Sequence, residues 1–266
     1  METWWIFLLT GLFTGFFAGL LGIGGGLMIV PVLITVFTDK GFAEGQVMHL
    51  ALGTTTAIIA LTSISSLRAH HMRGAVDWQI VRHLTPGIVL GVLAGTTLAG
   101  QLSSQVLGFI FVIFIYCAAA QMWLNLRPTT GFPLPGNMGM LAAGGTIGAI
   151  SSLVAIGGGL LTVPFLAACR ISLHRAIGTA AAVGFPIALA SAIGYAVNGA
   201  LQSRLLPDYA LGYIYLPAFV LVALSGILTA PLGAKAAHAM PADKLRKIFA
   251  GLLCLLGIKL LLKFWY

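Results

Sequence analysis

Residues 23–33 read IGGGLMIVPVL, and residues 156–166 read IGGGLLTVPFL. The two stretches lie 133 residues apart, and 8 of their 11 aligned positions are identical. Three successive glycines, followed five residues later by a proline, interrupt a helix. Membrane transporters use such breaks at mid-depth, where the backbone dipoles of the two helix pieces face a solute. A break that occurs twice in one chain therefore indicates a transporter.

The composition excludes an ordinary soluble domain. The 266 residues are 59% hydrophobic and 8% charged, with a mean hydropathy of +1.03, whereas soluble domains carry about 25% charged residues. A helix that crosses a bilayer needs roughly 20 apolar residues. The apolar segments cover about residues 4–37, 47–67, 80–100, 104–124, 138–169, 176–200, 209–234 and 247–266. We therefore expect an all-α polytopic membrane protein, in which the net charge of +8 lies in loops rather than on a nucleic-acid surface.

The repeat extends beyond the glycine stretches. Residues 51–54 (ALGT) match residues 176–179 (AIGT) at an offset of 125. The sequence thus predicts an N-terminal repeat over residues 1–124 and a C-terminal repeat over residues 138–266. A proline-rich linker, residues 125–137, joins them. Each repeat is expected to contain a glycine-interrupted helix followed by three transmembrane helices.

The distribution of Lys and Arg indicates how the repeats are oriented. If all eight segments are simple crossings, the 14 cations divide equally between the two faces. If each interrupted segment enters and leaves on one side, only Lys40, Arg204, Lys259 and Lys263 face away from the other ten. The positive-inside rule favours the second arrangement. We therefore expect two inverted repeats, with both termini outside.

The carboxylates indicate the sign of the solute. All six lie at segment ends or in loops: Glu2, Asp39, Glu44, Asp77, Asp208 and Asp243. Cation carriers usually place Asp or Glu within the membrane, so their absence there favours an anion. The N–H groups at the start of a helix, together with the helix dipole, bind anions. The predicted substrate-binding residues are therefore the glycines of both breaks, Gly24, Gly25, Gly26, Gly157, Gly158 and Gly159. Close helix packing is the alternative role for these glycines.

Thr54 and Thr179 are the matched hydroxyls of the two repeats, and each follows a matched glycine. They are predicted either as donors to the solute or as partners in interhelical hydrogen bonds. His49 begins a span and is either an interfacial histidine or a proton carrier. The apolar segments contain no HExxH, no GxSxG and no Cys/His pair. We therefore expect no enzyme activity, no metal site and no cofactor.

The chain resembles the sulfite exporter TauE/SafE family, also called the 4-toluene sulfonate uptake permease family. The resemblance rests on GLLGIGGGLMIVPVL (19–33), SLVAIGGGLLTVPFL (152–166), and the pairs Gly53-Thr54 and Gly178-Thr179. It implies a multi-pass permease of the bacterial inner membrane that moves sulfite, sulfoacetate or a related organosulfonate. The second copy departs from the first where Ala155 replaces Gly22, which could make the two glycine breaks unequal.

Together these features predict a secondary transporter that works by alternating access. Its partners are the lipid bilayer and a small anionic solute, with no nucleic acid. Coupling to protons or to sodium stays open. Three alternatives also stay open: an anion channel, a transporter for small carboxylates, and a non-transporting membrane scaffold.

Overall fold

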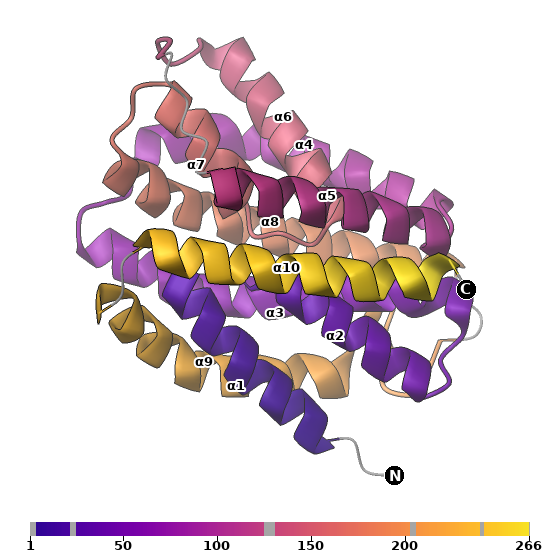
Figure 1. Ribbon diagram of the computed structural model, residues 1–266. Helices are drawn as coiled ribbons and strands as arrows, with labels where there is room; N and C mark the ends of the chain where they lie inside the picture. Colours follow the sequence, from indigo (N-terminus) through magenta and orange to yellow (C-terminus); the bar gives the residue numbers. More distant parts are fainter. Residues whose placement is uncertain (1–3, 22–24, 125–130, 203–205, 240–241, 266) are drawn as a thin grey trace.

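The structure is a computed structural model that describes residues 4–21, 25–124, 131–202, 206–239 and 242–265. These residues are almost entirely helical (Figure 1). The helices are α1 (Trp4–Leu21), α2 (Gly26–Asp39), α3 (Glu44–Met72), α4 (Trp78–Gln101), α5 (Ser104–Leu124), α6 (Asn137–Leu153), α7 (Gly159–Ala168), α8 (Leu173–Gln202), α9 (Leu216–Ala239) and α10 (Ala242–Trp265).

The outer surface of this helical bundle is apolar. In the described part of the chain, four helices are long and apolar enough to cross a membrane, namely α3, α4, α5 and α8. Large apolar side chains point outward from several of the others as well, such as Leu228 at 72% exposed and Leu255 at 66%. Soluble proteins rarely expose apolar surface on this scale. The predicted all-helical, multi-pass membrane architecture is thus supported.

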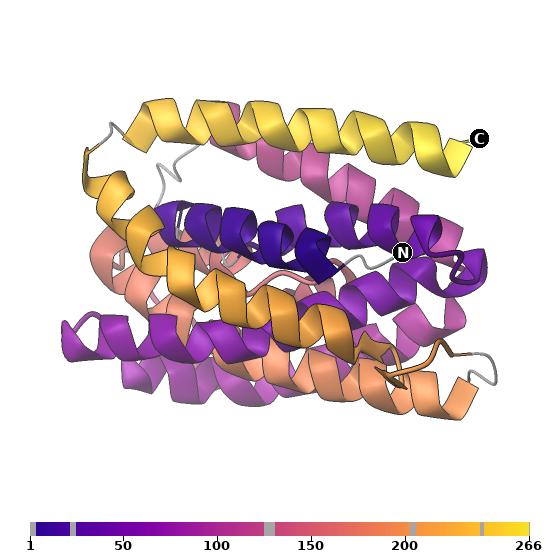
Figure 2. The ribbon, with the colours of Figure 1, turned by 90° about the horizontal axis from the view of Figure 1, so that it is seen from below.

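In Figure 1, α8 and α10 run nearly parallel while α1 and α6 slope across them, and the first residues of α1 and the last of α10 lie towards the same end (Figures 1 and 2). Five pairings dominate: α1 with α9, α4 with α6, α3 with α8, α4 with α8, and α5 with α10. Every one of these pairs joins a helix that precedes the linker to one that follows it. The two halves of the chain are therefore interleaved rather than packed as separate units.

Positions matched by the repeat make the same kind of contact in the two halves. A Cβ atom on Gly15 of α1 would lie 2.3 Å from the Gly226 carbonyl oxygen of α9. A Cβ on Gly148 of α6, which lies 133 residues later, would lie 2.4 Å from the Ile88 carbonyl oxygen of α4. Small residues at such crossings let membrane helices approach closely. Here the first helix of each half approaches a helix of the other half.

The apolar segment expected from residue 209 onward begins differently from the prediction. Residues 210–215 form a short antiparallel hairpin of β1 (Ala210–Leu211) and β2 (Ile214–Tyr215), and α9 begins only at Leu216. Gly212 occupies the first position of the two-residue turn with φ 55°, a conformation that such tight turns require and glycine adopts readily. The hairpin packs against α3, α8 and α9.

Candidate functional site

The two glycine stretches interrupt helices at nearly the predicted residues. The described part of the first break begins at Gly25, since Gly24 lies outside the described residues. Gly25 precedes α2 with φ 66°, and Gly158 precedes α7 with φ 73°. This left-handed conformation costs other residues about 1–2 kcal/mol, and glycine adopts it freely. Each triple glycine therefore ends in a left-handed turn from which a short helix starts.

The two breaks are in contact with each other. A Cβ on Gly26 would lie 2.2 Å from the Ala155 carbonyl oxygen and 2.9 Å from Ile59 Cδ1. A Cβ on Gly157 would lie 3.1 Å from Ile59 Cγ2. Ile59 belongs to the middle of α3, so α3 touches both breaks. We call this meeting of residues 25–26, residues 155–159 and Ile59 the glycine junction.

Helix α8 completes the glycine junction from the other side. A Cβ on Gly184 would lie 2.6 Å from the Gly157 carbonyl oxygen, and Ile187 lies beside Gly158. Gly184 and Ile59 are matched by the offset of 125 residues. Both central helices thus meet the junction near their middles, far from either end of the bundle.

The backbone at the junction leaves few donors for a ligand. The N–H groups of Met28 and Ile29 donate to the Gly25 carbonyl. Those of Leu161 and Thr162 donate to the Gly158 carbonyl. The N–H group of Leu160 has no hydrogen-bond partner among the described residues, and those of Gly26 and Leu27 have none outside residues 22–24, which the structure does not describe. These are the first-turn donors that helix geometry leaves free and that the helix dipole makes attractive to anions.

The break in the second half carries backbone strain that the first-half sequence avoids. Ala155 takes φ 48°, an unusual conformation for a residue with a side chain. The matched residue of the first half is Gly22, which lies outside the described residues. The N–H of Gly159 donates to the Gly157 carbonyl at 2.9 Å. The two breaks are thus chemically unequal.

Thr54 and Thr179 both hold a loop from the other half of the chain. The Thr54 hydroxyl oxygen accepts the N–H of Tyr215 at 2.9 Å, and the Thr179 hydroxyl oxygen accepts the N–H of Asp77 at 3.0 Å. Both threonines are fully buried. The loop after α8 is therefore tied to α3, and the loop after α3 is tied to α8.

The glycine before each threonine makes the second half of the same contact. A Cβ on Gly53 would lie 2.3 Å from the Tyr213 carbonyl oxygen, and a Cβ on Gly178 would lie 2.4 Å from that of Ala75. In both loops the carbonyl lies two residues before the amide that the threonine accepts. We call these two contacts the α3 clamp (Gly53-Thr54) and the α8 clamp (Gly178-Thr179).

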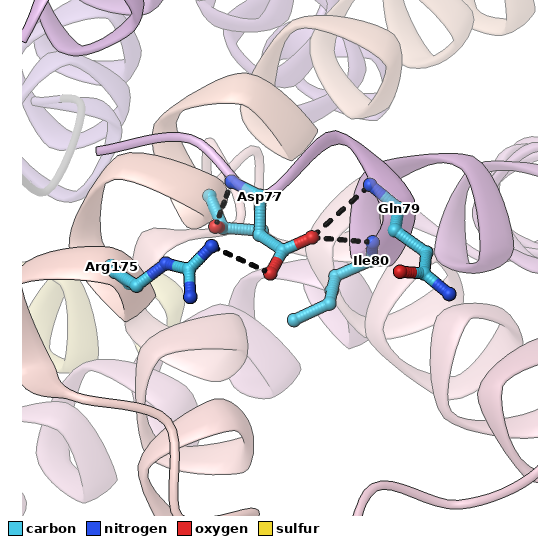
Figure 3. A network of polar contacts seen from close by, with 5 residues as sticks. Asp77, Gln79, Ile80 and Arg175 are labelled. Carbon is cyan, nitrogen blue, oxygen red and sulfur yellow. Dashed lines mark hydrogen bonds and ion pairs between the residues drawn. The ribbon is translucent and has the colours of Figure 1, made fainter. Parts of the chain in front are cut away.

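The α8 clamp carries an ion pair (Figure 3). Asp77 precedes α4 and accepts the N–H groups of Gln79 and Ile80, which caps the helix. Its other carboxylate oxygen lies 3.2 Å from the guanidinium of Arg175 at the start of α8. Leu50 stands where the repeat matches Arg175 in α3. Among the described residues, this is the single ion pair between carboxylate and cation.

His49 has well-defined partners near the start of α3. Its Nε2 lies 2.9 Å from the Ala99 carbonyl oxygen and its Nδ1 lies 3.3 Å from Ser104 Oγ. The ring stacks on Tyr213 with 4.9 Å between centroids. His49 thereby links α3 to the last turn of α4 and to the first residue of α5. No group of three His, Cys, Asp or Glu that could hold a metal ion occurs in the described ranges.

Three other buried hydroxyls lack a hydrogen-bond partner in the described part of the chain, and none of them is among the substrate-binding residues predicted from the sequence. They are Thr55 in α3, Ser151 in α6 and Thr162 in α7. A comparison of the two repeats could have found them. Their matched positions hold Ala180, Ala18 and Ile29, so each hydroxyl occurs in one half only.

Comparison with known proteins identifies the family. The family model "Sulfite exporter TauE/SafE" matches residues 7–260. The chain belongs to this family. It is 38% identical to a probable membrane transporter protein of Haemophilus influenzae, over 96% of this chain and 97% of the relative. It is 26% identical to another of Methanocaldococcus jannaschii, over 97% and 95% of the two chains. No solved structure matches the chain.

Membership in the TauE/SafE family confirms the resemblance seen in the sequence. The family and its relatives indicate a membrane transporter, which is not an enzyme class. The names of the relatives specify neither a solute nor a coupling ion.

Proposed function

We propose that this TauE/SafE protein is a secondary transporter that moves a small sulfur-containing anion, such as sulfite or an organosulfonate, across the bacterial inner membrane. The observation that carries the proposal is the glycine junction, where the start of α2 lies against the break before α7. In this proposal the backbone around Gly24–Gly26 and Gly157–Gly159 holds the solute, with donors at the helix starts such as the N–H of Leu160, while the Gly159 N–H itself donates to the Gly157 carbonyl. Two helix starts then direct partial positive charge at one place.

The charges around the junction suit an anion. Along the described middles of α3 and α8 there is no carboxylate that would repel one, and Asp77 lies outside them at the start of α4. A buried Arg would cost about 2.5–3.5 kcal/mol at the centre of a membrane helix. Backbone N–H donors attract an anion without that cost, because they carry no full charge that must be moved into the membrane.

The clamps support two halves of opposite orientation. Thr54 lies in the first half of α3 and binds the loop that follows α8, whereas Thr179 lies near the start of α8 and binds the loop that follows α3. The start of each helix thus lies beside the end of the other, as expected for inverted repeats. The clamps then lie towards opposite ends of the bundle. In alternating access, each clamp closes one side of the membrane in turn.

Thr54 and Thr179 enter the proposal through these clamps. Each hydroxyl oxygen is engaged by a loop N–H, which favours interhelical bonding over direct contact with the solute. Among the described residues, the ion pair between Asp77 and Arg175 has no counterpart at the α3 clamp. We therefore expect the two sides of the transporter to open with different ease.

Transport by purified protein in sealed liposomes tests the function. We would record currents with sulfite, sulfoacetate, taurine, sulfate and acetate, with and without gradients of protons or sodium. A saturable current that responds to a gradient identifies a coupled transporter and its solute. A current that ignores both gradients identifies a channel. A response to acetate alone identifies a carboxylate carrier. Silence in currents and in labelled-solute uptake would refute transport of these anions and favour a scaffold.

Two glycine variants connect transport to the junction. Gly158→Val places a branched side chain at φ 73° and within 2.6 Å of Ile187 Cδ1, so we expect loss of transport. Gly157→Ala is milder, since its Cβ would lie 3.1 Å from Ile59 Cγ2 with no positive φ. The control is Gly251→Ala in α10, where a Cβ meets nothing within 4 Å. Normal transport by folded Gly158→Val and Gly157→Ala proteins would refute the junction as the solute site.

A further inference from the structure

We propose that Thr162, together with Ser151 and Thr55, supplies side-chain hydroxyl donors to the oxygens of the transported anion. The anion then binds off-centre, at the break of the second half. This inference rests on the proposed function, because it names further ligands of the same solute. The inference predicts that the solute is an oxyanion. Its several oxygens would accept hydrogen bonds from these uncharged hydroxyl donors.

The three hydroxyls are buried and have no hydrogen-bond partner among the described residues. Thr55, Ser151 and Thr162 are each 0% exposed, and their hydroxyl oxygens have no hydrogen-bond partner among the described residues. Buried polar groups in native proteins are almost always hydrogen-bonded, because an unpaired group loses its hydrogen bonds to water and gains none within the protein. Three such hydroxyls indicate that their partner is a molecule other than the chain.

The Thr162 hydroxyl differs in its bonding from most other threonine hydroxyls of this protein. Most threonines of its helices donate to the carbonyl four residues earlier: Thr10, Thr14, Thr35, Thr38, Thr62, Thr85, Thr96, Thr97 and Thr146. For Thr162 that carbonyl belongs to Gly158, which already accepts the N–H groups of Leu161 and Thr162. A carbonyl has two lone pairs. The usual acceptor is therefore occupied, and the Thr162 hydroxyl hydrogen is left to donate elsewhere.

The three hydroxyl residues lie near the glycine junction. Thr162 Oγ1 lies 3.6 Å from the place of a Cβ on Gly158, directly beside the left-handed turn. The Ser151 carbonyl accepts the N–H of Ile156 and so closes the break on its other side. Thr55 lies one helical turn before Ile59, on the face of α3 that touches both breaks. Thr162 thus adjoins the glycine junction directly, Ser151 lies at the turn that leads into the second break, and Thr55 lies one helical turn from Ile59.

Each of the three hydroxyls occurs in one repeat only. The matched residues Ile29, Ala18 and Ala180 carry no hydroxyl. A hydroxyl needed by the architecture of both halves would occur in both, as Thr54 and Thr179 do. The three hydroxyls therefore have a role that is not part of the repeated architecture. Binding of a single solute is such a role.

Replacement of Thr162 by valine separates this role from a structural one. Valine has the shape of threonine without the hydroxyl, so Thr162→Val removes an unpaired polar group from the interior. We expect its thermal unfolding midpoint to be equal to or above that of the wild type. At the same time its affinity for sulfite or sulfoacetate, measured by calorimetry in detergent, should fall roughly tenfold to a hundredfold. Thr162→Ser should restore most of the affinity.

The matched control is Thr10→Val in α1. Its hydroxyl is buried like that of Thr162, but it donates to the Ile6 carbonyl. We expect Thr10→Val to keep wild-type affinity. A lower unfolding midpoint for Thr162→Val would show a structural partner and overturn the inference, as would wild-type affinity in that variant. If the wild type itself binds none of the five solutes, the proposed function fails and the inference fails with it. Wild-type binding with unchanged Thr162→Val affinity overturns the inference alone.

Discussion

Replacing Gly53 by alanine should open the α3 clamp and leave the α8 clamp closed. The new Cβ would lie 2.3 Å from the Tyr213 carbonyl oxygen, whereas ordinary contacts begin at 3.4 Å. The loop must therefore retreat by about 1 Å, since the opposing atom is backbone. The hydrogen bond from the Tyr215 N–H to Thr54, now 2.9 Å, would lengthen to about 4 Å, beyond hydrogen-bonding range.

The free-energy cost follows from that lost hydrogen bond. A buried amide left unpaired costs about 1–3 kcal/mol. A cost of about 2 kcal/mol corresponds to a roughly thirtyfold change in the opening equilibrium of the loop. Native-state amide hydrogen exchange measures such opening directly. We expect the Tyr215 amide of Gly53→Ala to exchange roughly thirtyfold faster than in the wild type, with the Asp77 amide unchanged.

The repeat provides a mirror-image variant and a neutral one. Gly178→Ala should accelerate exchange at Asp77 and leave Tyr215 unchanged, because its Cβ would lie 2.4 Å from the Ala75 carbonyl oxygen. Gly45→Ala, also in α3, meets nothing within 4 Å and should alter neither amide. Exchange at Tyr215 within twofold of wild type in Gly53→Ala would refute the clamp as the reason for this glycine.

Two further predictions concern stability. Ala155→Gly should raise the free energy of unfolding by roughly 0.5–1 kcal/mol, because glycine takes φ 48° without strain. A lower unfolding midpoint in detergent would contradict this reason. Arg175→Ala should cost less than about 1 kcal/mol, since the Arg175 side chain is 55% exposed and the pair with Asp77 is screened. Its effect should vanish in high salt. A larger loss than that of Thr179→Val would show that the ion pair, rather than the hydrogen bond, dominates the α8 clamp.

Local chemistry accounts for the features that the sequence predicted well. The long apolar segments exclude a soluble fold, because nothing else in the composition could cover so much apolar surface. The helix breaks fall at the glycines, because a left-handed turn is open to glycine and costly to other residues. Helices α2 and α7 begin at the last glycine of each triplet, at Gly26 and Gly159. The family resemblance rests on the same stretches and is confirmed by the match over residues 7–260.

Long-range contacts decided what the sequence could not. Thr54 and Thr62 look alike in an apolar helix, yet Thr62 donates to its own helix and Thr54 accepts an N–H from 161 residues away. The hairpin before α9 likewise reads as the start of an apolar segment until its turn at Gly212 is seen.

The sequence by itself determined that this chain is a helical membrane protein with two glycine-broken helices, because composition and glycine stereochemistry act within one segment. Only the tertiary structure decided that the two breaks touch at Ile59, that matched threonines hold opposite loops, and that Thr162 keeps an unpaired hydroxyl beside Gly158. Such pairings depend on which backbone groups meet in space, and neither residue type nor spacing along the chain encodes that meeting.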